Sequence, residues 1–476
     1  MRTRFALYGL MIVQLVPCTL SQGEETAMLD PPVAKRVPHV LRAHNHERID
    51  DYYWLRERDN PEVIAYLEAE NAYLDSKMAH TQAFQEALFE EIKGRIKEDD
   101  SSAPYQYKNY WYYTRFEQGR AYPLYCRRAE SMNAPEQIML DVNLLAEGHE
   151  FCQVSGPRTS EDQNLALYGA DFVGRRFYTL RIRDLRRGKD LDDVIADVTG
   201  HAVGANDNQT IFYTKQDPLT LRSYQIYRHR LGTPVSEDVL VYEEPDETFN
   251  CGVYKTKSRE YIVIASRQTL TRESRYLPAD NPTASPMLFA ERERGHEYDV
   301  DHYGEYFYIK TNREAKNFRL MRAQPGHTQP DAWEEVVPHR EDTLFEAFEL
   351  FESHLVLSDR REGLARLNVI PWNGSAPHEV DFGEPVYEAA IGVNHDGESS
   401  TLRFVYTSMT TPNSVFDYDL NTREKRLVKQ EMVLGGFDRD NYITERLWAT
   451  ARDGVRVPIS IVYRKDFKRD GAAPLL

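Results

Sequence analysis

The residues that could carry catalysis are serines, histidines and acidic side chains, and their spacing here completes no common catalytic signature. No Gly-x-Ser-x-Gly elbow occurs, and the nearest phrase, at residues 373–377 (NGSAP), lacks the second glycine. Phosphate-binding and dinucleotide-binding glycine loops are also missing from the sequence. We therefore predict no catalytic residue between positions 1 and 476, assign no substrate-binding residue, and expect residues 373–377 to form a turn between strands.

Histidines offer the other chemistry to be tested, which is metal binding. His-Glu dipeptides begin at His46, His149, His296 and His378, and none is followed by the second histidine of a zinc-binding helix. His39, His44 and His46 cluster without an acidic or thiol ligand at suitable spacing. We expect surface or interdomain histidines, no metal and no cofactor.

The cysteines do not predict a disulfide framework. Cys18, Cys126, Cys152 and Cys251 include no Cys-x-x-Cys pair, and Cys18 lies in a candidate leader. The remaining three are an odd number, and we expect them to be buried thiols.

The first 23 residues resemble a secretory signal. Arg2 and Arg4 precede a mostly apolar stretch at residues 6–16, and small residues follow at positions suited to cleavage. The alternative is a wrongly chosen start codon. The expectation is a periplasmic or secreted protein if the signal is real, and a cytoplasmic one otherwise. No other apolar run reaches the length of a membrane span.

Residues 24–103 are predicted to form a helical segment. Asn60 can cap a helix that begins at Pro61, and a second apolar stripe includes Phe84, Leu88 and Ile92. A charged, turn-rich stretch ends this pattern at Pro104.

Beyond Pro104 the same phrase recurs, an apolar and aromatic strand followed by a polar turn and another strand. The copies lie at residues 110–114, 176–180, 211–214, 261–265, 306–309, 354–358 and 403–407. A period of about 40 to 50 residues with several short strands is typical of a β-propeller. We therefore predict a mainly β protein with a seven-bladed propeller over residues 104–430, with a pair of β-sandwiches as the alternative. The 30 tyrosines are expected to pack mainly between blades.

The last segment, residues 431–476, begins a different pattern. Alternating apolar and polar residues flank Asp453 and Gly454, which predicts a hairpin. A further strand begins near Leu476, and an isolated hairpin leaves bare edges, so we expect this segment to be the start of a truncated domain.

Composition restricts the partners. The chain has 59 Lys and Arg against 76 Asp and Glu, a net charge of −17, and 41% hydrophobic residues. These values fit a folded globular protein and argue against nucleic acid as a partner, because phosphate binding needs a basic face.

Several longer phrases resemble the prolyl oligopeptidase family of serine peptidases. The opening is similar at residues 30–34 (DPPVA) and 51–56 (DYYWLR). Residues 61–73, 90–98, 140–143 and 205–208 resemble its oligopeptidase B branch, as do residues 444–458. The resemblance spans about residues 30 to 476.

The resemblance implies an α/β-hydrolase domain with a Ser-Asp-His triad, covered by a seven-bladed propeller that acts as a size filter. Helices at residues 24–103 would pack on the hydrolase domain, and residues 431–476 would begin that domain. The implied activity is cleavage of short peptides after Arg or Lys, with the triad beyond Leu476 and this chain inactive alone. The alternative is a propeller that binds partners without chemistry, or a pseudoenzyme. The oligomeric state stays open.

Overall fold

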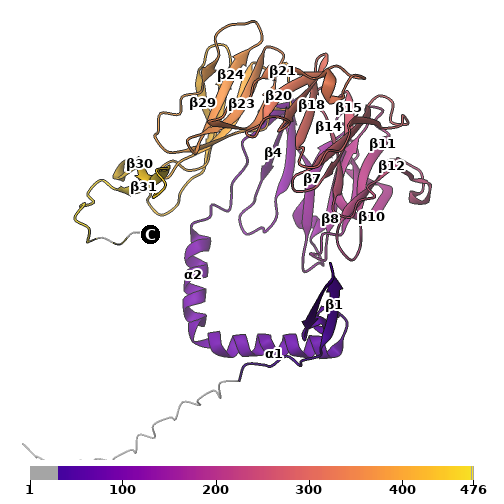
Figure 1. The fold of residues 1–476 in the computed structure, drawn as a ribbon, viewed down its shortest axis with the longest axis vertical. Coiled ribbons are helices and arrows are strands. Elements are labelled where there is room, and N and C mark those ends of the chain that lie inside the picture. The colour runs from indigo at the N-terminus through magenta and orange to yellow at the C-terminus, as the bar shows by residue number, and fades with distance from the viewer. Residues whose placement is uncertain (1–29, 473, 475–476) are drawn as a thin grey trace, which may run out of the picture. The chain divides into compact units, whose positions relative to one another are not determined.

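The computed structural model describes residues 30–472 and 474, in two compact units that divide at Arg95 and Ile96 (Figure 1). The expected leader at residues 1–23, Cys18 included, lies outside the described residues.

The first unit contains a hairpin of β1 (His39–Ala43) and β2 (His46–Asp50), followed by α1 (Pro61–Met78) and α2 (Gln82–Gly94). The two predicted helices are confirmed. The side chain of Asn60 accepts a hydrogen bond from the Glu62 backbone N–H at 2.9 Å, and Pro61 occupies the first helical position, where its missing N–H costs nothing.

The hairpin was not predicted. Its turn consists of His44 and Asn45, whose φ angles of 51° and 61° are those of a tight two-residue hairpin turn. Asparagine tolerates this region of φ, but histidine is an uncommon choice there, so the pair carries little turn signal.

The second unit is built from antiparallel sheets whose strands follow one another in sequence order. Five of them have four strands. The first contains β3 (Tyr105–Tyr107), β4 (Tyr110–Arg115), β5 (Leu124–Ala129) and β6 (Glu136–Asp141), and a short helix α3 (Val142–Leu145) follows it. The next contains β14 (Asn250–Lys255), β15 (Tyr261–Arg267), β16 (Arg272–Pro278) and β17 (Met287–Ala290). Another contains β18 (Tyr298–Tyr303), β19 (Tyr306–Thr311), β20 (Arg319–Ala323) and β21 (Glu334–Val337). The last two contain β22 (Thr343–Leu350), β23 (His354–Arg361), β24 (Leu364–Pro371) and β25 (His378–Glu379), and then β26 (Glu388–Ile391), β27 (Thr401–Thr407), β28 (Ser414–Asp419) and β29 (Lys425–Gln430).

The strands between the first and second of these sheets form one seven-stranded sheet, so the prediction of seven blades is wrong: the described residues contain five four-stranded blades. This sheet contains β7 (Gln153–Thr159), β8 (Leu165–Asp171), β9 (Tyr178–Asp184), β10 (Lys189–Gly204), β11 (Thr210–Gln216), β12 (Ser223–Arg230) and β13 (Val239–Glu243). Two of the recurring phrases, those of β9 and β11, therefore belong to the same sheet.

The physical cause is the 16-residue strand β10, which pairs with β9 as far as Val198 and with β11 from Val198 onward. The register shifts where the partner changes, and Gly200 there has a φ of 76°. A Cβ on Gly200 would lie 2.7 Å from the ring of Tyr178, so only glycine fits this bend. Periodicity in the sequence counts repeats, and it does not report that one strand continues through two of them.

The core lies between neighbouring sheets. Val263, Tyr276 and Phe289 of one sheet pack with Tyr298 and Phe307 of the next, and all five are at most 1% exposed. Each large aromatic side chain buries about 150–250 Å² in such a layer. The buried tyrosines of this layer agree with the expected packing between blades.

The first and last sheets meet through side chains, and β3 and β29 are not paired. Lys429 Nζ lies 2.6 Å from an Asp100 carboxylate oxygen, and Arg403 Nη1 donates to the carbonyl of Pro104 at 2.6 Å. These contacts close the succession of sheets into a ring. We call the zone of contact the seam.

The predicted C-terminal hairpin is confirmed as β30 (Tyr442–Thr450) and β31 (Arg456–Arg464). The side chain of Arg446 donates to the carbonyl of Glu362, in the turn between β23 and β24. That turn, the start of β3 and the end of β29 lie at one end of the ring, which we call the linker end.

Candidate functional site

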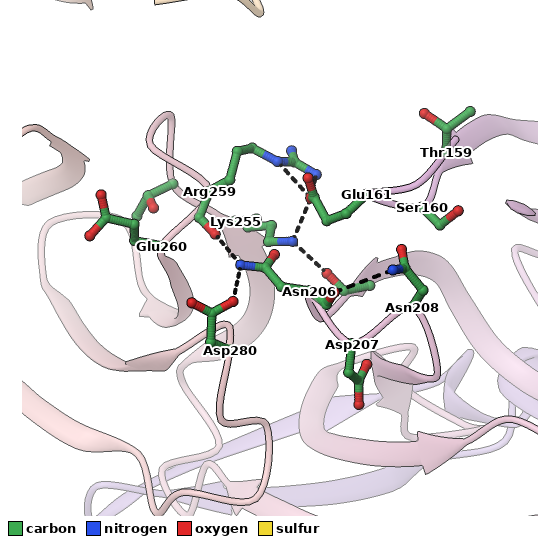
Figure 2. A network of polar contacts seen from close by, with 12 residues as sticks. Thr159, Ser160, Glu161, Asn206, Asp207, Asn208, Lys255, Arg259, Glu260 and Asp280 are labelled. Atoms are coloured by element: carbon green, nitrogen blue, oxygen red, sulfur yellow. Dashed lines mark hydrogen bonds and ion pairs between the residues drawn. The ribbon is translucent and has the colours of Figure 1, made fainter. Parts of the chain in front are cut away.

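Cationic side chains from two other sheets contact Glu161, and Figure 2 shows two of them, Lys255 and Arg259. Its carboxylate lies 2.8 Å from Lys108 Nζ, 2.7 Å from Lys255 Nζ and 2.9 Å from Arg259 Nε. Each of these residues lies at the end of the first strand of a hairpin or in the turn that follows it; the strands are β3, β7 and β14. The contacts with Glu161 bring these turns together at one end of the ring, where β3 ends, opposite the linker end where β3 begins; we call it the Glu161 end.

Local turns hold these side chains in place. Asp162, next to Glu161, accepts hydrogen bonds from the Ser160 hydroxyl at 2.6 Å and from the Asn164 backbone N–H at 3.0 Å. Arg259 has a φ of 67°, and its N–H donates to the Thr256 carbonyl at 2.9 Å. Short polar turns therefore hold the residues that carry these long charged side chains in place around Glu161.

The ionisation of the cluster follows from its contacts. Partial burial opposes ionisation of Glu161, but Arg259, Lys108 and Lys255 outweigh it and lower the pKa of its carboxyl to about 2. Burial, and then the charge of Arg259, lower the pKa of Lys255 to about 8. The cluster carries more positive than negative charge.

A second charged contact reaches across the ring. Lys257 donates to the carbonyl of Asn394 and pairs with Glu349. Its sheet, β14–β17, is separated from the sheet of Asn394, β26–β29, by two others in chain order. The side chains at the Glu161 end therefore narrow the opening along the axis.

The phrase at residues 205–208, which supported the resemblance, positions this cluster. Asn206 Nδ2 donates to Asp280 Oδ1 at 2.7 Å and to the Arg259 carbonyl at 3.1 Å (Figure 2). Asp207 accepts from the backbone N–H of Thr210 at 2.8 Å, which closes the turn between β10 and β11. These residues fix the loop that carries Arg259.

One Ser–His pair deserves a test as a catalytic dyad. Ser258 Oγ lies 2.9 Å from His302 Nδ1, but His302 is 1% exposed. Burial lowers the pKa of His302 to about 4, and the neighbouring carboxylate of Asp301 accepts from its backbone N–H, not from its ring. The pair is a packing contact, because an acyl-transfer base needs access to substrate and an orienting carboxylate. Ser375 lies in the turn between β24 and β25, as predicted.

The sequence-selected histidines belong to several different elements. His39 stacks on Tyr53 and His149 on Phe172, with ring centroids 3.9 and 4.0 Å apart. His44 and His46 lie in the turn and second strand of the first hairpin, while His296 bonds Thr311 and His378 bonds Tyr418, each at 2.8 Å. Across residues 30–472, no three His, Cys, Asp or Glu side chains form a group able to hold a metal.

The three cysteines of the described chain are buried free thiols, as predicted. They are Cys126, Cys152 and Cys251. Burial raises the pKa of Cys126 and of Cys251 to about 12, so neither thiol is a ready nucleophile.

A buried array of two carboxylates and an imidazole escaped the sequence reasoning. His229 Nδ1 lies 2.6 Å from Asp238, and its Nε2 lies 3.0 Å from Asp193. His229 is fully buried, and the Gly232 backbone N–H also donates to Asp193 at 2.6 Å. The array joins β10, β12 and the loop before β13, and it has a structural role.

The Glu161 cluster was also missed, because its members are far apart in the sequence. The usable signal was their common position: Lys108, Glu161 and Lys255 each end or follow the first strand of a hairpin. An alignment of the repeats to one another places such residues at one end of the ring.

Comparison with known proteins identifies the family. The family described as "Prolyl oligopeptidase, N-terminal beta-propeller domain" matches residues 31–431. The chain is 40% identical over 470 residues to dipeptidyl aminopeptidase BI of Pseudoxanthomonas mexicana, and 33% identical over 452 residues to protease 2 of Moraxella lacunata. Each alignment covers 94% of this chain and 65% of the relative.

Solved structures of similar proteins agree with this family assignment. The structure of oligopeptidase B from Leishmania major matches with a TM-score of 0.85 and 31% identity, over 93% of this chain and 66% of that one. Oligopeptidase B from Trypanosoma brucei, with covalently bound antipain, gives a TM-score of 0.84 and 30% identity, over 92% and 66%.

The chain thus spans about 65% of the length of these curated relatives. None of the helices in the described part is long and apolar enough to cross a membrane. The matched residues, the propeller architecture and the identities together place this chain in the prolyl oligopeptidase family of serine peptidases.

Proposed function

We propose that the chain is the propeller-containing part of a serine oligopeptidase that cleaves short peptides after Arg or Lys. The observation that carries the proposal is the structural likeness to oligopeptidase B over 93% of the chain. The acyl-transfer step is expected to use a serine, a histidine that takes its proton, an aspartate that orients the histidine, and backbone N–H donors for the oxyanion. We expect these groups beyond Leu476.

The ring is proposed to exclude large substrates. Its support is the contact of Lys257 with Asn394, together with the cluster around Glu161, because these side chains extend into the opening from different sheets. On this proposal a folded protein is too wide to pass, whereas an extended peptide presents only its own side chains.

Residues 24–103 and 431–476 are proposed to belong to the catalytic side, and residues 104–430 to the propeller. The support is exposed apolar surface in both flanking parts. On α2, Phe84 is 67% and Phe89 is 62% exposed, while on the terminal hairpin Val457 and Ile459 are 44% and 42% exposed. Surfaces of this kind mark interfaces in soluble proteins.

A peptide reporter tests the reaction. We expect no turnover of a blocked Arg-amide reporter by this chain, and turnover by the polypeptide encoded when its reading frame is followed past Leu476. Turnover by the chain itself, blocked by a serine-reactive inhibitor, would contradict the placement of the triad. A continuation without a serine elbow would instead favour a binding module.

A different cleavage specificity is the alternative to cleavage after Arg or Lys. Its support is that the relative that is 40% identical is named a dipeptidyl aminopeptidase. Under this alternative the enzyme releases dipeptides from a free amino terminus. Paired reporters decide: a dipeptidyl-amide with a free amino group is cleaved in this case and its N-acetylated form is not, whereas the Arg- or Lys-directed endopeptidase cleaves the acetylated form.

Export is proposed from the signal-like start at residues 1–23. Sequencing the amino terminus of the protein recovered from its source checks this, because cleavage near residue 23 is expected and an intact Met1 contradicts it.

A further inference from the structure

A cavity of about 340 Å³ lies beside the Glu161 cluster. Its walls come from β3, β4, β7, β10, β14, the turn after β14 and the loop after β26. The volume is within the range of small-molecule sites, which begin at about 300 Å³. Three cations line it, Arg158, Lys255 and Arg259, and no carboxylate is among its lining residues.

The positive charge of this cavity is only partly neutralised by the protein. Glu161 is one carboxylate shared by Lys108, Lys255 and Arg259. Arg158 makes no ion pair with any carboxylate in the described part of the chain, and its guanidinium donates to the Ala202 carbonyl at 3.3 Å. Arg158 is exposed at the cavity, and a cation without a counter-ion attracts an anionic ligand.

The remaining wall is aromatic. The rings of Tyr105, Tyr107 and Tyr112 line the cavity, and the Tyr107 hydroxyl is buried with no hydrogen-bond partner among the described residues. A bare inorganic ion would leave these rings without contact. A carboxylate attached to a small apolar or peptide body fills the volume and matches the planar guanidinium, which binds two oxygens at once.

We propose that this cavity binds the carboxylate of a small ligand, and that its occupant is the C-terminal carboxylate of a short peptide. The choice of a peptide rests on the proposed function, and the carboxylate chemistry rests on the cavity. The site lies at the Glu161 end of the ring, away from the linker end. Because its charged lining is cationic, it would hold a peptide by its carboxyl terminus and would not bind a basic side chain.

Calorimetric titration of this chain tests the proposal without any peptidase activity, so its failure is separable from failure of the proposed reaction. The probes are N-acetyl-Ala-Ala with a free carboxylate, its C-terminal amide, and inorganic phosphate, at pH 7 and low salt. We expect the acid to bind with a Kd on the order of 1 mM or tighter, and the amide at least about tenfold more weakly. Phosphate is expected to compete more weakly than the acid.

Variants locate the binding. Arg158→Gln is expected to weaken binding of the acid at least about tenfold, and Arg158→Lys to keep part of it. Arg175→Gln is the matched control, since Arg175 lies in the turn between β8 and β9 and does not line the cavity. Equal binding of acid and amide, phosphate binding more tightly than the acid, no binding at all, or full binding by a folded Arg158→Gln variant each overturns the proposal.

Discussion

Replacing Glu161 by glutamine removes the one carboxylate that Lys108, Lys255 and Arg259 share. Glutamine keeps the size of the side chain and one acceptor oxygen, so the change is mainly the loss of a negative charge. The Lys255 side chain is 4% exposed, and in the Glu161→Gln variant it lacks its carboxylate partner. Removing one member of a buried ion pair is costly because the other charge stays buried.

The expected cost can be worked from the ionisation of Glu161. A carboxyl whose pKa falls from 4.5 to about 2 on folding contributes about 3 kcal/mol at pH 7, because one pKa unit corresponds to about 1.4 kcal/mol. The side chain is 16% exposed, and we take about 2 kcal/mol after solvent screening. Unfolding entropy of about 2 cal/mol/K per residue, for residues 96–476, converts this into a fall in Tm of about 2–3 °C.

Differential scanning calorimetry at pH 7 measures the effect, with Glu260→Gln as the matched control. Glu260 lies next to Arg259 but is exposed, and burial and Asp280 raise the pKa of its carboxyl, so its replacement should leave Tm unchanged or slightly higher. If Glu161→Gln unfolds within 1 °C of the native chain, as the control is expected to do, the cluster does not stabilise the ring and our reasoning is wrong.

The pH dependence provides a second check. The pKa of Glu161 is lowered in the folded chain, so its contribution is complete well above pH 4.5 and is lost as the pH falls toward 2. At pH 4 the difference between native and Glu161→Gln should already be smaller by about 0.8 kcal/mol. A difference that grows on acidification contradicts the assignment.

Three further outcomes are expected. Replacing His229 by glutamine removes at least one of its buried hydrogen bonds to Asp193 and Asp238, and should cost about 1–3 kcal/mol in calorimetry. His327→Gln, at an exposed site, should cost less than about 0.5 kcal/mol, and equal Tm values for the two variants would contradict a structural array. Lys429→Met removes the contact with Asp100 at the seam, and because this pair is partly exposed we expect it to lower the free energy of unfolding by less than about 1 kcal/mol. Amide hydrogen exchange at residues 100–107 should nevertheless become faster, and unchanged exchange would mean that other contacts hold the seam. Carboxylate binding in the cavity should weaken as the pH rises above about 8, where Lys255 loses its proton. In calorimetric titrations between pH 7 and 9, Lys255→Met should abolish this pH dependence. If the variant retains the pH dependence, another group causes it.

Local patterns were sufficient for the elements whose signals are local. Asn60 and Pro61 predicted the start of α1, and Asp453 and Gly454 predicted the turn between β30 and β31. Each depends on the conformational preference of a few adjacent residues, which the sequence states directly.

The number of blades and the charged cluster depend on nonlocal contacts. Whether β10 ends or continues is decided by pairing with β9 on one side and β11 on the other, and Gly200 makes the bend between them feasible. Glu161 meets Arg259, 98 residues later, only because the sheets return around the axis. Spacing along the chain shows neither that β10 continues nor that Glu161 meets Arg259. Equivalent positions in successive repeats do indicate the contact between Glu161 and Arg259.

The seam has a consequence for how the protein is made. Its two sides, Asp100 and Lys429, are 329 residues apart, and at about 5–20 residues per second a ribosome needs about 15–65 s to deliver the second after the first. During that time the sheet that emerges first has one flank without its neighbour. Any pause in translation lengthens this interval, so newly made chains should be most open to chaperones and proteases at their earliest sheet, and this vulnerability should end when the last one arrives.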